Sequence, residues 1–441
     1  MFSPRSVLSK SVSNATQKFD GLISVPHQRN LREMILGMVV GESSRLSTIG
    51  SIAASGVTPR KNTERYAHAL GKIDVASCTD RHIVCAALAF RSEPVLILGD
   101  GGDMQKPHAR KMEQVCGCVD GSEGHTPGKG YPTFASMAYG LESGRQLPLF
   151  HHLYSTVDAD FKSAWNEQKQ CYERLTPFLG SPHDRIIVED QGCDDEKRFL
   201  FFVNEVQCSF LTRIKTGEKS RKLCCVRQGE IEEAISVEKI AQQMTLKAGA
   251  AKRWKNKKIR KICTSRIAWR EVRLPGHPEI PLFLVLLCTE GFAQPMVFLT
   301  DIAVRDAEKA WTVFFWYKKR WEVENFFRAI KQEFGAEGFL IRSFPAIRAL
   351  AFVQMLAFCL LLQLKEQAKE LLGLLVCWFT EFCDRWQRTT ESHIDLLHWI
   401  REAWHRMPCT GSHRFWSVEL LCHRFRKRRD QLSLFSLREK W

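Results

Sequence analysis

The sequence predicts an α/β protein with helical regions at both ends. Two short apolar runs that end in an acid, Pro94–Asp100 and Arg185–Asp190, are typical of buried strands. A helical pattern, Asp158–Leu179, lies between them, and such alternation favours a sheet covered by helices. Both ends of the chain carry apolar residues at helical spacing instead. We therefore expect three parts, which are 1–75, 76–340 and 341–441.

The first 75 residues predict a helical region that binds DNA. Leu31–Val40 is apolar at helical spacing, and a second helix follows through Leu46, Ile49 and Ile52. A turn at Gly56 then leads into a basic third helix. This order resembles a helix-turn-helix DNA reader. A plain helical bundle fits the same pattern equally well.

The central part predicts further strands and one insertion. Val115–Val119, Phe134–Phe150 and Ser209–Lys215 have strand character, and Asp194–Asn204 has helical character. The segment at about 216–300 contains three more strand-like runs and a basic run with one tryptophan, Trp254. It therefore predicts a mainly β insertion with a cationic surface. The three runs are Arg266–Val272, Ile280–Cys288 and Pro295–Leu299.

Composition favours a soluble protein with an anionic partner. The chain has 441 residues, of which 44% are hydrophobic, and a formal net charge of +15. Such an excess of positive charge favours nucleic acid or another polyanion. The 16 cysteines include no Cys-x2-Cys pair, which argues against a zinc site and for reduced thiols in a cytoplasmic protein. The apolar run Ala349–Leu364 is short for a membrane span, so we expect a buried helix there and no membrane contact.

One charged stretch carries most of the functional information. Tyr317, Arg320, Glu324 and Lys331 fall on nearly one line of a helix, and Arg328 joins that line. One carboxylate would thus sit among three cations and a phenol, on a face suited to an anion and a metal ion. The alternative is a solvated face with Glu–Arg pairs at helical spacing. An apolar stripe on the same helix predicts that it packs on a core, through Trp316, Val323, Phe327, Ile330 and Phe334.

Three acids are candidates for a metal site. Asp100 and Asp190 each end a predicted strand, and ligands collect at the carboxyl ends of strands in α/β sheets. With Glu324 they would provide oxygen ligands for two Mg²⁺ ions, with Mn²⁺ expected to substitute. Two ions about 4 Å apart stabilise the attacking and leaving oxygens of phosphoryl transfer.

Other acids and cations near these positions leave alternatives open. Asp103 and Asp120 compete for the metal role, and the choice between Asp100 and Asp103 stays open at this stage. Asp194 is expected to be an N-cap of the next helix. Lys106 is expected to contact a DNA phosphate. Arg110 and Lys111 fit either a phosphate contact or a solvated face.

The charged stretch also carries a family resemblance. Tyr317-x2-Arg320-x3-Glu324-x6-Lys331 is similar to the Tyr-Arg-Glu-Lys signature of the IS-four-type DDE transposases of insertion sequences. The segments around Asp100 and Asp190 resemble the regions of that family's first two acids. The likeness covers about residues 75–360. One departure is Gln191, because the family often has arginine after its second acid.

The resemblance implies an RNase H-like catalytic core, interrupted by the β-rich insertion, and metal-dependent cut-and-paste transposition, often through a DNA hairpin. It implies that Asp100, Asp190 and Glu324 hold the metals and that Tyr317, Arg320 and Lys331 grip phosphates of the transposon end. It also implies that an aromatic of the insertion stacks on a flipped base, with Trp254 and Trp269 as candidates.

The expected partners are double-stranded DNA, namely the terminal inverted repeats of the element and its target, and a second copy of the chain. The helical C-terminal region is a candidate for the dimer contacts. Two alternatives remain: a nuclease of the same core that does not join strands, and an inactive DNA-binding relative.

Overall fold

The structure is a computed structural model. It describes residues 4–53, 56–120, 126–175, 184–217, 220–244, 246, 251–256, 261–292 and 294–376. The side chain of Trp254, the end of the C-terminal region beyond 376 and most of its expected dimer surface lie outside the described residues.

The N-terminal region is helical, but its last helix extends past the predicted boundary at residue 75 to Ala89. Its helices are α1 (Pro4–Gln17), α2 (Val25–Gly41), α3 (Leu46–Ile52), α4 (Pro59–Leu70) and α5 (Val75–Ala89). Glycines allow α2, α3 and α4 to cross closely. A Cβ atom at Gly37 would lie 2.7 Å from Ile49 Cγ2, and one at Gly50 would lie 2.9 Å from the Pro59 carbonyl oxygen. α3 therefore packs closely against α2 and against the start of α4.

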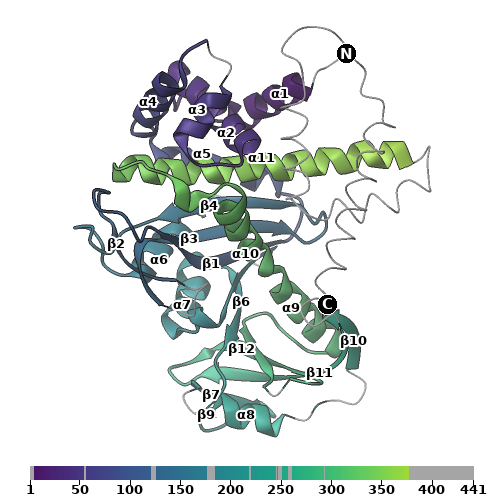
Figure 1. Cartoon of the computed structure of the whole chain (residues 1–441). Coiled ribbons are helices and arrows are strands. Elements are labelled where there is room, and N and C mark those ends of the chain that lie inside the picture. The colour runs from purple at the N-terminus through teal and green to yellow at the C-terminus, as the bar shows by residue number, and fades with distance from the viewer. Residues whose placement is uncertain are drawn as a thin grey trace, which may run out of the picture. The chain divides into compact units, whose positions relative to one another are not determined.

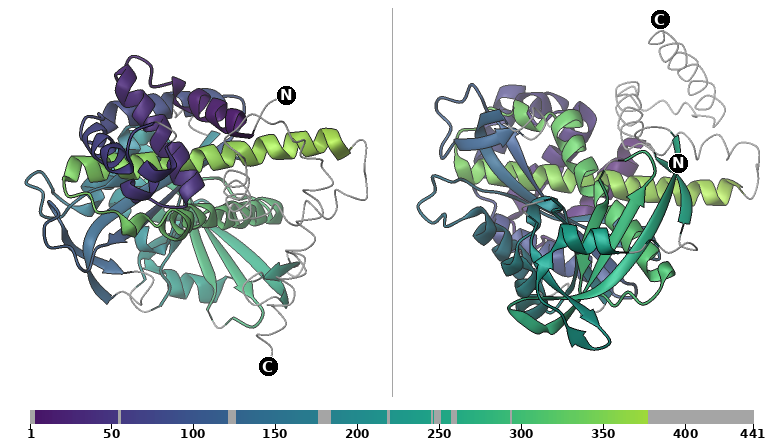
Figure 2. Two further views of the ribbon diagram at one scale, coloured as in Figure 1. Left: turned by 45° about the horizontal axis from the view of Figure 1, so that its top comes forward. Right: turned by 90° about the horizontal axis from the view of Figure 1, so that it is seen from below.

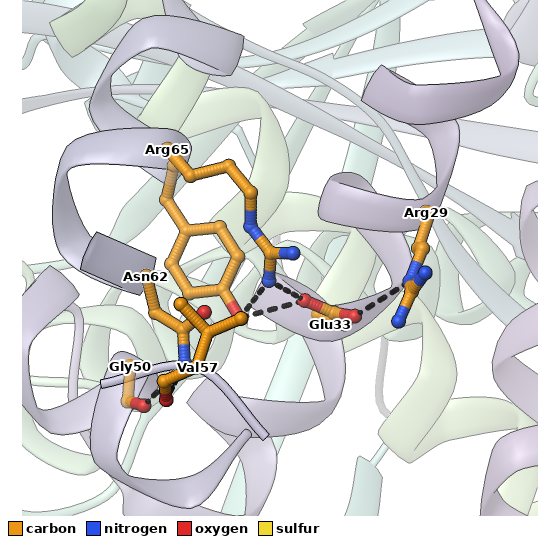
Figure 3. A network of polar contacts seen from close by, with 7 residues as sticks. Arg29, Glu33, Gly50, Val57, Asn62 and Arg65 are labelled. Carbon is orange, nitrogen blue, oxygen red and sulfur yellow. Dashed lines mark hydrogen bonds and ion pairs between the residues drawn. The ribbon is translucent and has the colours of Figure 1, made fainter. Parts of the chain in front are cut away.

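A polar network fastens α4 to α2 and α3 (Figure 3). Glu33 of α2 accepts hydrogen bonds from Arg29, from Arg65 and, at 2.8 Å, from the Tyr66 hydroxyl. Asn62 is fully buried and donates to the Gly50 carbonyl oxygen at 3.1 Å. Arg65 and Tyr66 thus neutralise and solvate a partly buried carboxylate, which fixes the orientation of α4.

The centre of the molecule is one mixed sheet (Figure 1). Its strand order is β2-β3-β1-β5-β6-β13-β12-β11-β7-β8, with β4 on β3, β10 on β11 and β9 on β7. β1 and β5 are parallel, as are β5 and β6, whereas β3 and β13 run antiparallel to their neighbours. The strands predicted for the insertion therefore continue the sheet of the core through the pairing of β13 with β6.

The strands of the first half are β1 (Val95–Gln105), β2 (Cys116–Asp120), β3 (Thr126–Gly140), β4 (Gln146–Leu153), β5 (Arg185–Glu189) and β6 (Ser209–Ile214). Those of the second half are β7 (Lys222–Arg227), β8 (Glu230–Ile231), β9 (Ile235–Ser236), β10 (Ala251–Asn256), β11 (Lys261–Leu274), β12 (His277–Thr289) and β13 (Met296–Thr300). The single strand expected at Phe134–Phe150 is instead two strands joined by a turn, because Gly140 accepts a hydrogen bond from Gly144 and closes it.

Helices cover the sheet and form its core with apolar side chains. α6 (Ala164–Glu173) and α7 (Glu196–Leu200) pack Tyr172 and Phe199 against the sheet residues Phe134 and Phe210. The π-helical turn after α7, Phe201–Val206, adds Phe202 to the same core. The predicted helix Asp158–Leu179 is thus shorter than expected, since it starts at the Ser163 N-cap. A further short helix is α8 (Val237–Gln243).

The charged stretch forms two helices rather than one. α9 (Ala307–Lys319) and α10 (Trp321–Arg328) meet at Arg320, and a π-helical turn over Ala329–Glu333 follows α10. The extra residue in a π turn shifts the following positions around the axis. Lys331 therefore does not continue the line of Tyr317, Arg320 and Glu324 that a straight helix would give.

The apolar helix α11 (Phe344–Val376) packs against β4 and against α1, α2, α4 and α5. Figure 2 shows it from two further sides, beside the N-terminal helices. Its segment Phe344–Glu366 is long and apolar enough to cross a membrane, but 83% of its most apolar window is buried inside the protein. Such burial is typical of the core helix of a soluble protein.

Candidate active site

Two of the predicted acids lie at the same level of neighbouring parallel strands. The last pairs of β1 and β5 are Ile97–Ile187 and Leu98–Val188. Asp100 and Asp190 each come two residues after the last pair, so the register brings them side by side. Asp190 follows β5 directly, as predicted, and its Oδ1 accepts a 2.8 Å hydrogen bond from the Gly192 amide.

Asp100 does not end its strand, which corrects the sequence interpretation. β1 continues to Gln105 and pairs with β3, with Asp100 opposite Ala135. The sequence pattern did not predict that β1 continues past Asp100, because the three glycines around Asp100 are unfavourable in strands. At two of them a side chain would collide: a Cβ at Gly99 would lie 2.2 Å from the Tyr172 hydroxyl, and one at Gly102 would lie 2.9 Å from Phe327 Cε1.

Glu324 approaches these acids from α10. That helix buries Val323 and Phe326 and packs against β1, where Phe327 occupies the space that Gly102 leaves open. Phe326 and Phe327 also contact His151 of β4 edge-to-face, at 5.4 and 6.0 Å between ring centroids. The apolar face of α10 thus holds Glu324 over the strand that carries Asp100.

Arg320 lies between two of the acids. Its Nη1 donates to Asp100 Oδ2 at 2.8 Å, and its Nη2 donates to Glu324 Oε1. Its side chain is only 12% exposed, and its Nε is buried without a hydrogen-bond partner. One guanidinium therefore bridges a strand acid and a helix acid and keeps one further donor unused.

The acids interact electrostatically. Burial raises the pKa of Asp100 to about 7; Arg320 opposes this rise, whereas Asp190 and Glu324 add to it. Burial acts against the charge of Arg320, but Asp100, Tyr317 and Glu324 together raise its pKa. The three predicted acids thus share one partly desolvated site in which negative charge is only partly compensated.

Tyr317 belongs to the same site. Burial raises the pKa of its phenol, and its ring lies 4.8 Å from Phe298 of β13. Arg320 and Asp190 both influence its titration, which places the phenol close to them. Arg328, in contrast, is exposed and forms no ion pair with the residues that the structure describes.

Lys331 pairs with a different acid of β1. Its Nζ lies 3.0 Å from Asp103 Oδ2 and 3.4 Å from Glu337 Oε1. Burial lowers the pKa of Lys331, but these two carboxylates outweigh burial and raise it. Glu337 also accepts a hydrogen bond from the Gln105 amide at 3.0 Å, so it ties the end of β1 to the turn after the π-helical segment. The structure thus separates Asp100, beside Arg320, from Asp103, beside Lys331.

Lys106 has a structural contact in place of the expected phosphate contact. Its Nζ donates to the carbonyl oxygens of Glu337 and Phe339, at 2.6 and 2.7 Å, and lies 3.5 Å from the centre of the Phe339 ring. The residue is only 6% exposed, and burial lowers the pKa of Lys106 to about 8. This geometry does not support the DNA contact expected for Lys106.

A buried network behind Asp190 was not expected from the sequence. Glu189 is fully buried and accepts hydrogen bonds from Arg198 and, at 2.8 Å, from the Tyr172 hydroxyl. Glu189 and Asp190 are adjacent, and the side chains of adjacent residues in an extended strand point to opposite faces. Glu189 is therefore held in the core while Asp190 faces the site. An acid inside an otherwise apolar strand, with an arginine nine residues later, is the only signal the sequence offers.

The expected N-cap role of Asp194 is wrong. Asp195 is the N-cap of α7 and accepts from the Lys197 amide, whereas Asp194 accepts from the Lys215 amide and from Arg221 Nε. The two adjacent aspartates could not be distinguished by pattern, because either fits a helix N-terminus.

The donor set suits a hard divalent cation, but the acids are not gathered around one point. Carboxylate oxygens are the ligands that Mg²⁺ prefers. Among the described residues, however, no three His, Cys, Asp or Glu side chains are grouped closely enough to hold a metal ion. Arg320 forms ion pairs with both Asp100 and Glu324, so a cation of the protein itself compensates this pair.

Comparison with known proteins decides the family. Residues 91–360 match the model of the transposase DDE domain, which covers more than half of the chain. The chain belongs to the transposase DDE domain family. The match begins just before β1 and ends inside α11, so it includes all three predicted acids. No curated protein matches the chain.

Proposed function

We propose that this protein is a DNA transposase that cleaves the ends of its own mobile element and joins them to target DNA. One observation carries the proposal: acids from β1, from the end of β5 and from α10, far apart in the sequence, interact within one partly buried site. Membership of the transposase DDE domain family implies transposase-type chemistry on DNA.

An RNase H-like core is the proposed framework. The order β4-β3-β1-β5-β6, with antiparallel pairs on one side of β1 and parallel pairs on the other, supports it. The strands from β7 to β12 are then the insertion, which joins the core sheet through β13. In this fold the acids lie on rigid elements, which holds them in a defined geometry.

Asp100, Asp190 and Glu324 are the proposed ligands of Mg²⁺, or of Mn²⁺ in its place. Such ions, when bound, would activate water and neutralise charge on the reacting phosphate. Arg320 would hold a phosphate oxygen and neutralise charge that develops in the transition state. Its unused Nε donor supports this role, because a guanidinium binds phosphate through two donors at once.

Tyr317, Lys331 and Arg328 are proposed to contact the DNA backbone around the same site. Tyr317 lies against Arg320, Lys331 lies at the end of β1, and Arg328 is exposed on α10. Such contacts fix the position of the scissile phosphate without reading sequence.

The N-terminal helices are proposed to bind the terminal repeats. α4 follows α3 along the chain and begins with exposed Arg60 and Lys61, as the second helix of a helix-turn-helix does. The Glu33 network fixes its orientation (Figure 3). Two ends must be held together for transposition, so we propose a dimer on DNA.

Glu324→Gln tests the proposal. The substrate is labelled DNA that contains the inverted repeats flanking the reading frame. We expect Mg²⁺-dependent cleavage to fall by orders of magnitude while DNA binding persists, because the amide keeps the shape but loses the charge. Glu322→Gln, on the same helix, is the matched control and should cut normally. Normal cleavage by Glu324→Gln would refute the site assignment.

The products separate the alternatives. A transposase joins the freed 3′ end to a second strand, and a hairpin appears as a joined product of doubled length under denaturing conditions. Nicks without any joined product would favour a nuclease of the same core. DNA binding without any Mg²⁺-dependent cleavage would favour an inactive relative.

A further inference from the structure

Arg320 occupies an unusual position for a phosphate-binding residue. Both of its terminal nitrogens are bound to carboxylates of the chain, Asp100 and Glu324, instead of being open to an anionic ligand. Its side chain is 12% exposed, whereas that of Glu324 is 29% exposed and that of Asp100 is 18% exposed. The guanidinium is therefore the most enclosed of the three groups.

The bridge formed by Arg320 disfavours binding of both proposed ligands, the divalent cation and the DNA phosphate. A divalent cation between Asp100 and Glu324 would have to approach a guanidinium that already holds both carboxylates, so like charges would repel at close range. A DNA phosphate would have to attract Arg320 away from those same carboxylates. Neither ligand alone gains its full interaction energy, because each leaves part of the protein's charge without a partner.

We propose that Arg320 is a displaceable counter-ion that makes DNA and the divalent cation bind cooperatively. Without DNA, its guanidinium holds Asp100 and Glu324 in place of a metal. A phosphate of the DNA end draws the guanidinium away, and the two carboxylates are then free for the cation. The inference rests on the proposed function and deepens it, since it states how the two ligands of that site depend on one another.

The neighbouring contacts support a movement of Arg320 alone. Asp100 lies in the middle of a paired strand and α10 is fixed by Phe326 and Phe327, so the backbones of the carboxylates are rigid. Arg320 lies at the junction of α9 and α10 with helical backbone angles, so its movement needs only rotation about its side-chain bonds. Its Nε is buried without a partner, so the present arrangement leaves one donor unsatisfied that a phosphate would satisfy.

Mn²⁺ binding by the full chain tests the inference without any catalysis. Free Mn²⁺ is followed by electron paramagnetic resonance, with and without a duplex taken from the DNA flanking the reading frame. We expect the duplex to tighten Mn²⁺ binding about 5–150-fold, the usual range for coupled sites. By linkage, Mn²⁺ should tighten duplex binding by the same factor.

Arg320→Met should remove the coupling. Without DNA this variant should bind Mn²⁺ more tightly than the wild-type chain, because Asp100 and Glu324 lose their internal cation. The duplex should then add little further affinity for Mn²⁺. Arg305→Met, which removes an exposed arginine just before α9, is the matched control and should leave Mn²⁺ affinity without DNA unchanged.

The outcomes separate this inference from the proposed function. Equal Mn²⁺ affinity with and without the duplex in the wild-type chain would overturn the inference, and this measurement needs no variant. If that affinity also disappears in Asp100→Asn, the metal site of the proposed function still stands. If the wild-type chain binds no Mn²⁺ even with the duplex and does not cleave it, the proposed function fails and the inference fails with it.

Discussion

Arg320 Nη1 lies 2.8 Å from Asp100 Oδ2, although the two residues are 220 positions apart in the sequence. This ion pair joins the junction of α9 and α10 to the middle of β1. It compensates part of the charge of the three acids, because Arg320 opposes the rise in the pKa of Asp100 that burial, Asp190 and Glu324 cause. Arg320, to which the family resemblance gives a DNA phosphate contact, is thus also a partner of the acids.

The close approach of α6 to β1 depends on Gly99. In Gly99→Ala the new Cβ would lie 2.2 Å from the Tyr172 hydroxyl, so the tyrosine must move and its bond to Glu189 must break. We expect a loss of about 1–3 kcal/mol in the free energy of unfolding, as for other overpacked cores. Chemical denaturation measures it.

A second substitution isolates the hydroxyl. Tyr172→Phe removes the colliding atom, so Gly99→Ala should cost less in that background than in the wild-type chain. Gly101→Ala is the control, because no atom lies within 4 Å of its added Cβ. Equal costs of Gly99→Ala in the two backgrounds would mean that the hydroxyl is not what the glycine accommodates.

The buried pair of Glu189 and Arg198 predicts a large loss of stability when one partner is removed. Arg198→Met leaves a fully buried carboxylate whose remaining side-chain donor, among the described residues, is the Tyr172 hydroxyl. We expect the free energy of unfolding to fall by about 3–5 kcal/mol. The double variant Glu189→Gln with Arg198→Met should recover part of this loss, and a further decrease would contradict the account.

Because its imidazole is buried, His82 should make the folded chain less stable in mild acid. Lys18 Nζ can only donate, so His82 Nδ1 accepts from it at 2.6 Å and Nε2 donates to the Pro148 carbonyl oxygen at 2.7 Å. Burial, with a further contribution from Lys18, lowers the pKa of His82 to about 3. The unfolded chain binds a proton near pH 6.5 and the folded chain does not, so stability falls as the pH drops from 6.5 towards 3.

The size of this effect is about 3 kcal/mol by pH 4.5, at about 1.4 kcal/mol for each pH unit below 6.5. Thermal unfolding measured from pH 7.5 to 4.5 should therefore show a steep decrease for the wild-type chain. A His82→Gln variant should be less stable at pH 7.5 but should lose less on acidification. Parallel pH profiles for the two proteins would exclude His82 as the cause.

If Lys331 contacts a DNA phosphate, its removal should weaken DNA binding. Lys331→Ala should speed dissociation of end DNA without Mg²⁺, and the salt dependence of binding should weaken by the equivalent of about one phosphate contact. Glu333→Ala, in the same π-helical turn, is the control. Fluorescence anisotropy at several salt concentrations gives both slopes, and unchanged binding and cleavage in Lys331→Ala would remove its phosphate role.

The parts of the fold that have strong local patterns were predictable. β5 and Asp190 follow from a short apolar run that ends in an acid, and the buried helix α11 follows from its length and composition. The pairing of Arg320 with Glu324 follows from their spacing of four residues, and this pair is present.

The remaining features depend on contacts between distant segments. β1 extends past Asp100 because β3 pairs with Gly101 and Gly102, and no local signal shows that pairing. The break at Arg320 and the π-helical turn shift Lys331 towards Asp103 and Glu337, which a straight helix cannot anticipate. Lysine is a residue type that commonly binds phosphate, but a turn more than 230 residues later in the chain buries the Lys106 amine.

The most direct test of the account locates the metal. Crystals of the full chain with end DNA and Mn²⁺ would reveal the ion by its anomalous scattering. We expect Mn²⁺ within coordination distance of Asp100, Asp190 and Glu324, with Arg320 turned towards a phosphate. Mn²⁺ held instead by Asp103 and Glu337, with Arg320 still bound to Asp100, would contradict it.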